Sequence, residues 1–393
     1  MTAFLLLWLG AQTVSVIAVL GFCIGLGRPA ARSREPAVAV IVAVKGRNIQ
    51  FDPFAESLFD QDYANYRVIF AVESERDPAF AAIEAWRQRL GDRVTLVVAG
   101  LAADEGQKTA NLRAAIFQLA PQGLAQQDEV LVFADADIVL DRSWIRRLVA
   151  PLVAGDADIV SGFTWVVVGD GRLSTFVLAS IASGLSTIPR LPFLNAAWGG
   201  STALLRKTFE ALDVAQAWRG TLSDDLQLTA IAQRAGCRIA TPREVLPRTI
   251  GHTAGFAGIT IQARRWYMLA RVYLPVTYGL MLAGTTFLAA GWLAAIAGAA
   301  IADPVARAVL AAAFACAVLR DLGRGVLVAR LWGRSGVAEN LAFLLVNPVI
   351  TPVAAVCNAG FAWSALLMRR TTWAGITYEL RAPQQVSVLS RVR

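Results

Sequence analysis

The chain is poor in histidine, lysine and cysteine. Its 393 residues include one histidine, His252, and four cysteines that lie far apart, three of them in apolar segments. Such a distribution indicates neither a disulfide framework nor a zinc site. Of the 37 basic residues only three are lysines, Lys45, Lys108 and Lys207. No run of basic residues is interleaved with aromatic ones, so we expect anionic lipid headgroups as partners, and not nucleic acid.

Hydrophobic residues, by contrast, make up 56% of the chain. Ordinary soluble enzymes are about one half apolar, so part of this chain is expected to lie in lipid. Ala3 to Leu26 is a stretch of 24 uncharged residues, longer than the ~20 that span a bilayer as a helix. It lacks a basic region before it and a clean small-residue cleavage site. A retained anchor over residues 1–27 is therefore preferred to a cleaved secretory signal.

Apolar sequence returns after residue 270. Three long regions are almost free of charge: Val272 to Ala302, Pro304 to Leu322 and Asn340 to Met368. We expect a membrane region over residues 271–370, followed by a basic cytosolic tail over 371–393. Three full crossings would leave that tail outside, against the positive-inside rule. Because Pro348 and Pro352 lie inside the third region, one region is predicted to be kinked or re-entrant, which returns the tail to the cytoplasm.

Between these membrane regions, β-rich runs alternate with helical stretches. The expected strands are residues 37–44, 66–72, 94–99, 129–134 and 157–168, and the expected helices are 79–90, 107–120, 173–188 and 222–236. This alternation predicts an α/β fold with a mostly parallel, doubly wound sheet. Ligands bind such sheets beyond the carboxyl ends of the strands. Lys45, Glu73 and Asp135 each follow an apolar strand, whereas the apolar helix 173–188 is expected in the core.

Asp135 and Asp137 close the most apolar of these strands. Alternate residues of a strand point to the same side, so the two carboxylates can hold one hard divalent cation. Mg²⁺ or Mn²⁺ in that place would neutralise a leaving diphosphate. The spacing also fits a solvated turn, but the position at a strand end favours a metal site.

Asp224 and Asp225 open the helix predicted over residues 222–236, with Ser223 as its N-cap. A favourable interaction with the helix dipole is a sufficient structural reason for both acids. The same environment keeps a carboxylate ionised, as a general base at neutral pH requires. The pair therefore has both a structural and a catalytic interpretation.

Gln262, Arg265 and Trp266 are spaced i, i+3 and i+4, so on a helix they share one face. Arg265 can clamp phosphate oxygens there, while Trp266 supplies an apolar wall. A basic aromatic belt at the membrane surface is the alternative. Both interpretations are compatible, since an acceptor drawn from the bilayer has to meet the site at this depth. His252, ten residues before Gln262, fits either a loop role or direct contact with the diphosphate, metal or acceptor.

In this order, the motifs resemble those of the inverting GT-A nucleotide-sugar glycosyltransferases (family 2-like), and most closely those of the ceramide glucosyltransferase group. The resemblance spans about residues 36–270 and extends to the flanking membrane regions. The order of its motifs is more specific than any single motif. The motifs are Lys45-Gly46, Asp77-Pro78-Ala79, Gly106-Gln107-Lys108-Thr109-Ala110-Asn111-Leu112, Asp135-Ala136-Asp137, Gly200-Ser201 before Leu205-Arg206-Lys207, Ser223-Asp224-Asp225, Gln262-Ala263-Arg264-Arg265-Trp266 and Trp373-Ala374-Gly375-Ile376-Thr377-Tyr378-Glu379-Leu380.

This resemblance implies a GT-A domain over residues 36–270 and a role for each matching position. The residues that it places around the nucleotide-sugar are Lys45, Glu73, Asp77, Lys108 and Asp135. It gives Asp135 and Asp137 as the metal pair and Asp225 as the catalytic base. The residues that it places at the acceptor or diphosphate are Asp224, Gln262, Arg265 and Trp266. The run Glu73-Ser74-Glu75-Arg76 departs from the more acidic sequence that the family has before its first aspartate.

The function implied is transfer of a hexose from a UDP-sugar to the hydroxyl of a membrane lipid, such as ceramide or diacylglycerol, with inversion to a β-glycolipid. Mg²⁺ or Mn²⁺ is the expected cofactor, and no obligate protein partner is evident. Arg28, Arg32 and Arg34 follow the first anchor, so we expect a multi-pass protein of a bacterial-type inner membrane with its catalytic domain in the cytoplasm. The alternatives are a processive β-glycan synthase, which would need a channel of several crossing helices, and a non-catalytic membrane scaffold with this fold.

Overall fold

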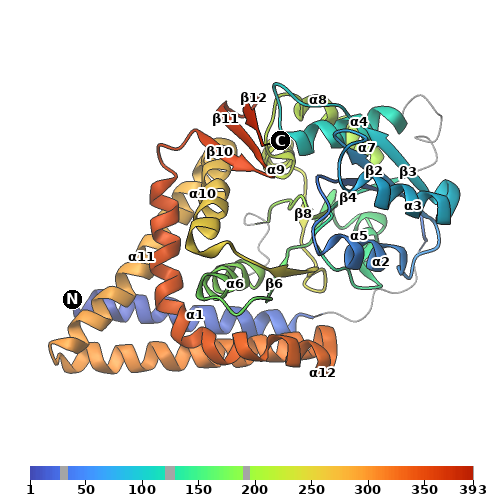
Figure 1. Cartoon of the computed structure of the whole chain (residues 1–393). Helices are drawn as coiled ribbons and strands as arrows, with labels where there is room; N and C mark the ends of the chain where they lie inside the picture. Colours follow the sequence, from blue (N-terminus) through green and yellow to red (C-terminus); the bar gives the residue numbers. More distant parts are fainter. Residues whose placement is uncertain (27–33, 120–128, 189–194, 393) are drawn as a thin grey trace.

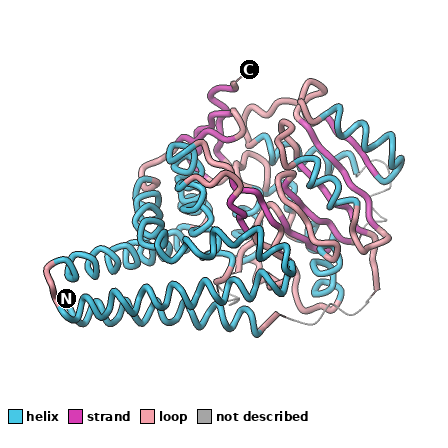
Figure 2. Tube along the Cα trace, turned by 60° about the horizontal axis from the view of Figure 1, so that its bottom comes forward, coloured by secondary structure: helices cyan, strands magenta, loops and turns pink. Residues whose placement is uncertain are grey.

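The computed structural model describes residues 1–26, 34–119, 129–188 and 195–392. An α/β domain lies beside a group of long helices, and a small sheet formed by the carboxyl-terminal residues packs against both (Figures 1 and 2). The predicted α/β class with a mostly parallel sheet is confirmed.

The main sheet has seven strands in the order β3-β2-β1-β4-β7-β5-β8. Their bounds are β1 Val38–Ala43, β2 Tyr66–Val72, β3 Val94–Val98, β4 Val130–Asp135, β5 Ile159–Ser161, β7 Ser201–Leu205 and β8 Ile239–Ala240. Strands β1 to β4 run parallel, whereas β7 is antiparallel to both β4 and β5. The run predicted as one strand over 157–168 divides, because β6 (Trp165–Val168) leaves the main sheet and pairs with β9 (Arg248–Gly251).

Helices cover both faces of the main sheet, which is why its central strands are apolar almost throughout. Side chains of Val38, Val40 and Val42 on β1 join one apolar cluster, and those of Ala39 and Ile41 join another. The first cluster is completed by α2 (Phe51–Phe59), α3 (Phe80–Leu90) and α5 (Trp144–Val153). The second is completed by α4 (Gln107–Leu119), α7 (Arg206–Ala211), α8 (Val214–Ala217) and α9 (Asp224–Arg234).

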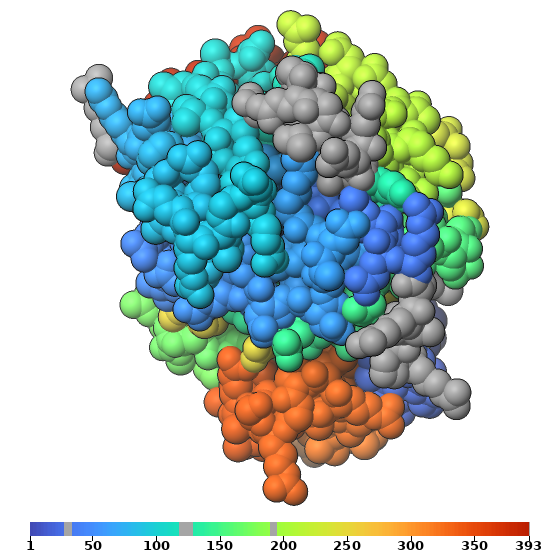
Figure 3. Space-filling view, turned by 90° about the vertical axis from the view of Figure 1, so that its right-hand side faces the viewer, coloured from blue at the N-terminus to red at the C-terminus, as the bar shows by residue number. Residues whose placement is uncertain are grey.

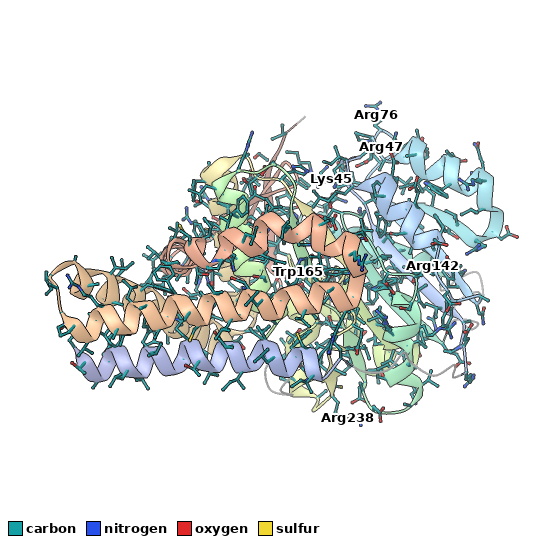
Figure 4. All side chains as sticks on the ribbon, turned by 90° about the horizontal axis from the view of Figure 1, so that it is seen from below. Lys45, Arg47, Arg76, Arg142, Trp165 and Arg238 are labelled. Carbon is teal, nitrogen blue, oxygen red and sulfur yellow. The ribbon has the colours of Figure 1, made fainter. Side chains whose placement is uncertain are left out.

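Helix α6 (Leu173–Ser186) lies in the core, as predicted. Nine of its 14 residues are buried. The five apolar ones belong to a third apolar cluster, shared with α10 (Gly255–Tyr273) and with the last long helix of the chain. Beside it, the indole of Trp165 on β6 donates a hydrogen bond of 2.9 Å to Asn340 of that long helix (Figure 4). The α/β domain and the long helices are thus joined through a common core.

Within the described residues, three helices are long and apolar enough to cross a membrane: α1 (Thr2–Ile24), α11 (Pro275–Ala300) and α12 (Pro304–Ser364). The amino terminus of α1 lies at the end of this group away from the main sheet (Figure 1). A membrane-length helix at the start of the chain is therefore present as predicted. Arg28 and Arg32, from which its orientation was predicted together with Arg34, lie outside the described residues, and the cytoplasmic orientation stays a prediction.

The three apolar regions predicted after residue 270 are helical, and the first of them is α11. The second and third apolar regions form one 61-residue helix, α12, which is broken at Gly333. At Gly333 the backbone has φ 67° and ψ −158°, a conformation that glycine alone reaches without strain. The charged residues on either side of the break, among them Arg330 and Glu339, lie in helical segments although they lower the hydropathy of the sequence there. Pro348 and Pro352 lie within α12, beyond the break.

The two parts of α12 run back beside each other from Gly333 (Figures 1 and 4). Arg320 Nη2 donates to Thr351 Oγ1 at 2.9 Å, and Asn347 Nδ2 donates to the Asp321 carboxylate at 2.9 Å. These residues are all buried or half-buried, so the hydrogen bonds hold the two parts together. The bend projects below the α/β domain (Figure 3). The predicted kinked element is therefore a helical hairpin whose backbone break lies at Gly333.

The predicted basic tail over 371–393 is largely a folded sheet. It consists of β10 (Arg370–Trp373), β11 (Ile376–Ala382) and β12 (Gln385–Arg391), all antiparallel. Ile376, Tyr378 and Leu380 alternate toward the third apolar cluster, and this burial is the reason that the segment folds. Because the sheet packs on the α/β domain, the carboxyl terminus lies on the same side as that domain (Figure 1). The segment is thus an integral part of the fold, and its return to the cytoplasm stays a prediction.

Candidate active site

Side chains predicted to act together meet at the carboxyl ends of β1, β2 and β4. Ala43 at the end of β1 is paired with Ala71 on one side and with Asp135 on the other. The three strands therefore end at one level. Lys45 and Glu73 follow the first two strands at that level, so the polar residues share one edge of the sheet, as expected.

Lys108 is the centre of a buried charged cluster. Its Nζ lies 2.7 Å from Asp135 Oδ1 and 3.3 Å from Asp224 Oδ1, and it donates to the Gly199 carbonyl at 3.2 Å. Burial alone would lower the pKa of Lys108, but Asp135, Asp224 and Asp225 together raise it above its ordinary value. The protonated lysine therefore joins acids from β4 and α9.

Asp224 is the deeper of the two acids that open α9. Its side chain is only 5% exposed, and burial raises its pKa to about 6, with Asp225 and Asp135 adding to the shift and Lys108 opposing it. Asp225 is half-buried. The more accessible carboxylate of the pair is thus that of Asp225.

Asp225 is held by hydrogen bonds to both of its oxygens. Oδ2 accepts from the Gly199 N–H at 3.0 Å, and Oδ1 accepts from the Leu226 N–H at 2.8 Å and from the Ser223 hydroxyl. Ser223 precedes α9 as predicted, but its hydroxyl supports Asp225 and does not cap a backbone N–H. The three donors fix the direction of the Asp225 carboxylate.

The side chain of Asp137 is exposed to solvent beside this cluster. Desolvation by the surrounding protein and the charge of Asp135 together raise its pKa to about 6, with Lys108 and Arg265 opposing the shift. Two carboxylates that oppose each other's ionisation fit a divalent cation, which relieves that repulsion. Among the described residues no group of three His, Cys, Asp or Glu side chains is arranged for a metal. The Asp135–Asp137 pair matches instead the way Mg²⁺ is held by one or two carboxylates together with substrate phosphates.

Arg265 reaches the acidic cluster from α10. Its guanidinium carbon lies 4.6 Å from the centre of the Trp373 ring on β10. Burial lowers the pKa of Arg265 to about 10 against the opposing charges of Asp135, Asp137 and Asp225, so the group remains charged at neutral pH.

The other two residues of this motif also lie on α10, so the motif is helical. Trp266 packs against the third apolar cluster, and Gln262 lies half-buried one turn before Arg265. Of the three, Arg265 is the one whose charge faces Asp135 and Asp225.

A second group of residues surrounds the ends of β1 and β2. Both Asp77 carboxylate oxygens lie 3.0 Å from the Gly46 N–H, and Oδ1 also accepts from Ala79 N at 2.8 Å. Asp77 thereby joins the loops that follow the two strands. Glu73 is ion-paired with Lys45 on one side and with Arg391 Nη1, at 3.0 Å, on the other.

His252 stands apart from both groups. It is exposed on the segment after β9, with its ring against Gly169, where an added Cβ would lie 2.8 Å from His252 Cε1. Within the described part of the chain it has no hydrogen bond or ion pair with Asp135, Asp137 or Asp225. Whether His252 has a loop role or contacts the diphosphate, metal or acceptor stays a prediction.

Sequence reasoning missed residues that reach the site from distant segments: Gly199, Gln107 and Arg391. A Cβ on Gly199 would lie 2.5 Å from Lys108 Nζ and 2.8 Å from Asp224 Oδ2, so the chain passes this cluster too closely for a side chain. The Gln107 N–H donates to Tyr378 OH at 3.2 Å, and its Oε1 accepts from Arg391 at 2.8 Å. Gln107 and Tyr378 lie in motifs that carried the resemblance, whereas Arg391 has no local signal.

Comparison with known proteins places these observations in a family. The sequence model of glycosyl transferase family 21 matches residues 5–386. No curated protein matches the chain. Among solved structures, the chain is similar to the mannosyltransferase PcManGT from Pyrobaculum calidifontis in complex with GDP-Man and Mn²⁺, with 18% identity, coverage of 93% of this chain and 99% of that one, and a TM-score of 0.47. It is also similar to TarS 1–349 of S. aureus in complex with UDP-GlcNAc, with 11% identity, coverage of 91% and 100%, and a TM-score of 0.40. Because the family match runs from α1 to the carboxyl-terminal sheet, the protein belongs to glycosyl transferase family 21.

Proposed function

We propose that the protein transfers a hexose from a UDP-sugar to the hydroxyl of a membrane lipid, with inversion, and so forms a β-glycolipid. The observation that carries this proposal is the position of α10. One side of this helix brings Arg265 to the acidic cluster, and another packs Tyr267 and Met268 into the core shared with α12. The site is therefore attached directly to a membrane-length helix, which favours an acceptor such as ceramide or diacylglycerol.

Asp225 is the proposed general base. It takes the proton of the acceptor hydroxyl while that oxygen forms a bond to the anomeric carbon of the donor. The bond between the anomeric carbon and the diphosphate oxygen breaks, and UDP leaves with the bonding electrons. Attack from the side opposite to UDP inverts an α-linked donor to a β-glycoside. Asp225 suits this role because it is half-buried, whereas Asp224 is buried against Lys108.

The negative charge of the leaving UDP is met by Arg265, whose fork of N–H donors suits phosphate oxygens. Asp135 and Asp137 would hold Mg²⁺ or Mn²⁺, whose charge would neutralise the diphosphate further. Lys108 keeps Asp135 and Asp224 close to each other at this point. Lys45, Glu73 and Asp77 are proposed to line the nucleoside side of the donor, and Gln262 and Trp266 the acceptor side.

We further propose that the site faces the cytoplasm of a bacterial-type inner membrane. A cytoplasmic site has access to UDP-sugars, and the carboxyl-terminal sheet lies on the same side as the site. The arginine-rich composition favours anionic lipids around the protein.

The function is tested by expressing the full-length protein in a host that lacks glycolipids and analysing the lipid extract by mass spectrometry. We expect a new lipid that carries one or two hexoses, and none with Asp225→Asn at equal protein level. A long polymer as product would identify a processive synthase instead. Absence of both glycolipid and UDP release with any lipid extract would support a non-catalytic scaffold.

A further inference from the structure

The carboxyl-terminal sheet is fixed to two loops that border the site. On one side, Tyr378 OH accepts from the Gln107 N–H at 3.2 Å, and the Val388 N–H donates to Ala103 O at 3.0 Å. On the other, Tyr273 OH donates to Pro383 O at 2.9 Å and accepts from the Leu222 N–H at 2.9 Å, just before α9. The sheet therefore contacts the segment that leads to Lys108, and Tyr273 of α10 links it to the segment that leads to Asp224.

Trp373 is placed by the tight turn between β10 and β11. Ala374 and Gly375 both have positive φ, 49° and 75°, as a two-residue hairpin turn requires. Trp373 pairs with Ile376 across this turn, and Ile376 is buried in the third apolar cluster. The ring beneath Arg265 thus has a fixed support.

Arg265 depends on that ring for its direction. The guanidinium lies 4.6 Å from the ring centre and makes no hydrogen bond with the residues that the structure describes. Its N–H groups are therefore free while its charge faces Asp135, Asp137 and Asp225. A cation held on an aromatic face, with its donors unused, is prepared to receive phosphate oxygens.

Arg391, at the end of β12, acts on the nucleoside side in a similar way. Its Nη1 lies 3.0 Å from Glu73 Oε2, and its Nη2 donates to Ala102 O and to Gln107 Oε1. Glu73 in turn holds Lys45. Two cations around one half-buried acid leave a net positive charge, which suits an anionic donor.

We propose that the carboxyl-terminal sheet is part of the donor site: Trp373 positions Arg265 for the diphosphate of a nucleotide-sugar, and Arg391 positions Glu73 and Lys45. The inference rests on the proposed function for the identity of the donor. Neither residue touches the reacting atoms, so both are positioning residues. The carboxyl-terminal segment, which the sequence predicted to be a basic tail, thereby determines the affinity for the donor.

The test is binding of UDP and of inorganic pyrophosphate, each with Mn²⁺, to the full-length protein in detergent, measured by calorimetry. The variants are Trp373→Leu, Trp373→Phe, Arg391→Gln and, as control, Arg381→Gln. Arg381 lies on the same sheet, but its side chain is 66% exposed and pairs only within the sheet, with Glu379. We expect Trp373→Leu to weaken binding of both probes about tenfold, the effect of losing a desolvated cation–π contact. Trp373→Phe should restore most of it, Arg391→Gln should weaken UDP more than pyrophosphate, and the control should bind like the wild type.

A double-mutant cycle with Arg265→Ala separates positioning from general loss of structure. If Trp373 acts through Arg265, Trp373→Leu adds little in the Arg265→Ala background. Additive effects, or unchanged affinity in Trp373→Leu, overturn the inference and leave the proposed function standing.

Wild-type protein that binds pyrophosphate but not UDP refutes the UDP assignment, and the cycle with pyrophosphate still decides the inference. Binding of neither probe overturns both. If Trp373→Leu does not fold, Trp373→Phe is compared with the wild type in the cycle with Arg265→Ala, and the same criterion of additivity applies.

Discussion

Lys108 Nζ and Asp135 Oδ1 form a 2.7 Å ion pair at the position where Asp135 is proposed to hold a metal ion. The lysine and the cation therefore share one carboxylate. Lys108 also repels a divalent cation held by Asp135 and Asp137, because at an effective dielectric constant near ~20 such charges still interact strongly across a few ångströms. This relationship makes the lysine a determinant of metal affinity as well as of structure.

Lys108→Gln should accordingly bind Mn²⁺ more tightly in the absence of nucleotide, by several-fold, because a repelling charge is removed. The same variant should unfold at a lower temperature, since Asp224 loses its only ion-pair partner among the described residues. Mn²⁺ titration followed by electron paramagnetic resonance and a thermal melt measure the two effects. Lys207→Gln, an exposed lysine outside the site, is the matched control. Weaker Mn²⁺ binding in Lys108→Gln would contradict the shared-carboxylate arrangement.

Mn²⁺ affinity should fall as the pH drops through about 6. The folded-state pKa of Asp137 is raised to about 6, so below that pH a proton competes with the metal, and above it the carboxylate is free to bind. Loss of one ionised ligand lowers the apparent affinity by up to about tenfold per pH unit below the pKa. The Mn²⁺-induced rise in melting temperature, measured between about pH 5 and 8, reports this change. A rise that is equally large at both ends of that range would show that Asp137 is not a ligand, and Asp137→Asn should lose most of the rise at every pH.

Local sequence patterns predicted the part of the site that lies at strand ends. Lys45, Glu73 and Asp135 could be placed together because parallel strands bring their carboxyl ends to one edge. Arg391 could not, because it pairs with Glu73 across 318 positions of sequence and no local pattern records such a contact. Arg324, which follows the second apolar region, interrupts the apolar sequence but is buried in an ion pair with Asp321, and hydropathy does not detect such a pair.

Gly199→Ala should lower activity at least about tenfold with a smaller effect on folding. Its Cβ would lie 2.5 Å from Lys108 Nζ and 2.8 Å from Asp224 Oδ2, and both groups are held in place by their ion pairs. The cluster would have to shift together with Asp225, whose carboxylate accepts from the Gly199 N–H. Steady-state assays with a thermal melt test this expectation. Gly184→Ala in α6 is the control, because nothing lies within 4 Å of its added carbon, and wild-type activity of Gly199→Ala would refute the close packing.

The helical hairpin predicts that the carboxyl terminus and the α/β domain face the same compartment. A cysteine placed after residue 393 and one at exposed Arg76 should therefore react alike with a membrane-impermeant thiol reagent, either both in intact cells or both only after lysis. Gly333→Ala should strain the bend, because alanine does not adopt φ 67° with ψ −158° readily, and should lower the yield of folded protein. Opposite labelling of the two cysteines would show that α12 crosses the membrane without returning.

Asp225→Asn and Asp224→Asn should both lose activity, but for different physical reasons. The difference tests the assignment of the base. Asn at 225 keeps hydrogen-bonding groups near Gly199 but cannot take a proton, so transfer should fall about a thousandfold while UDP–Mn²⁺ binding and the melting temperature stay near those of the wild type. Asn at 224 leaves Lys108 with less compensation in a buried position, which costs about 3 kcal/mol where a buried pair is broken. That variant should melt earlier and bind the donor weakly. Near-normal turnover of Asp225→Asn, with Asp224→Asn inactive but stable, would transfer the role of base to Asp224.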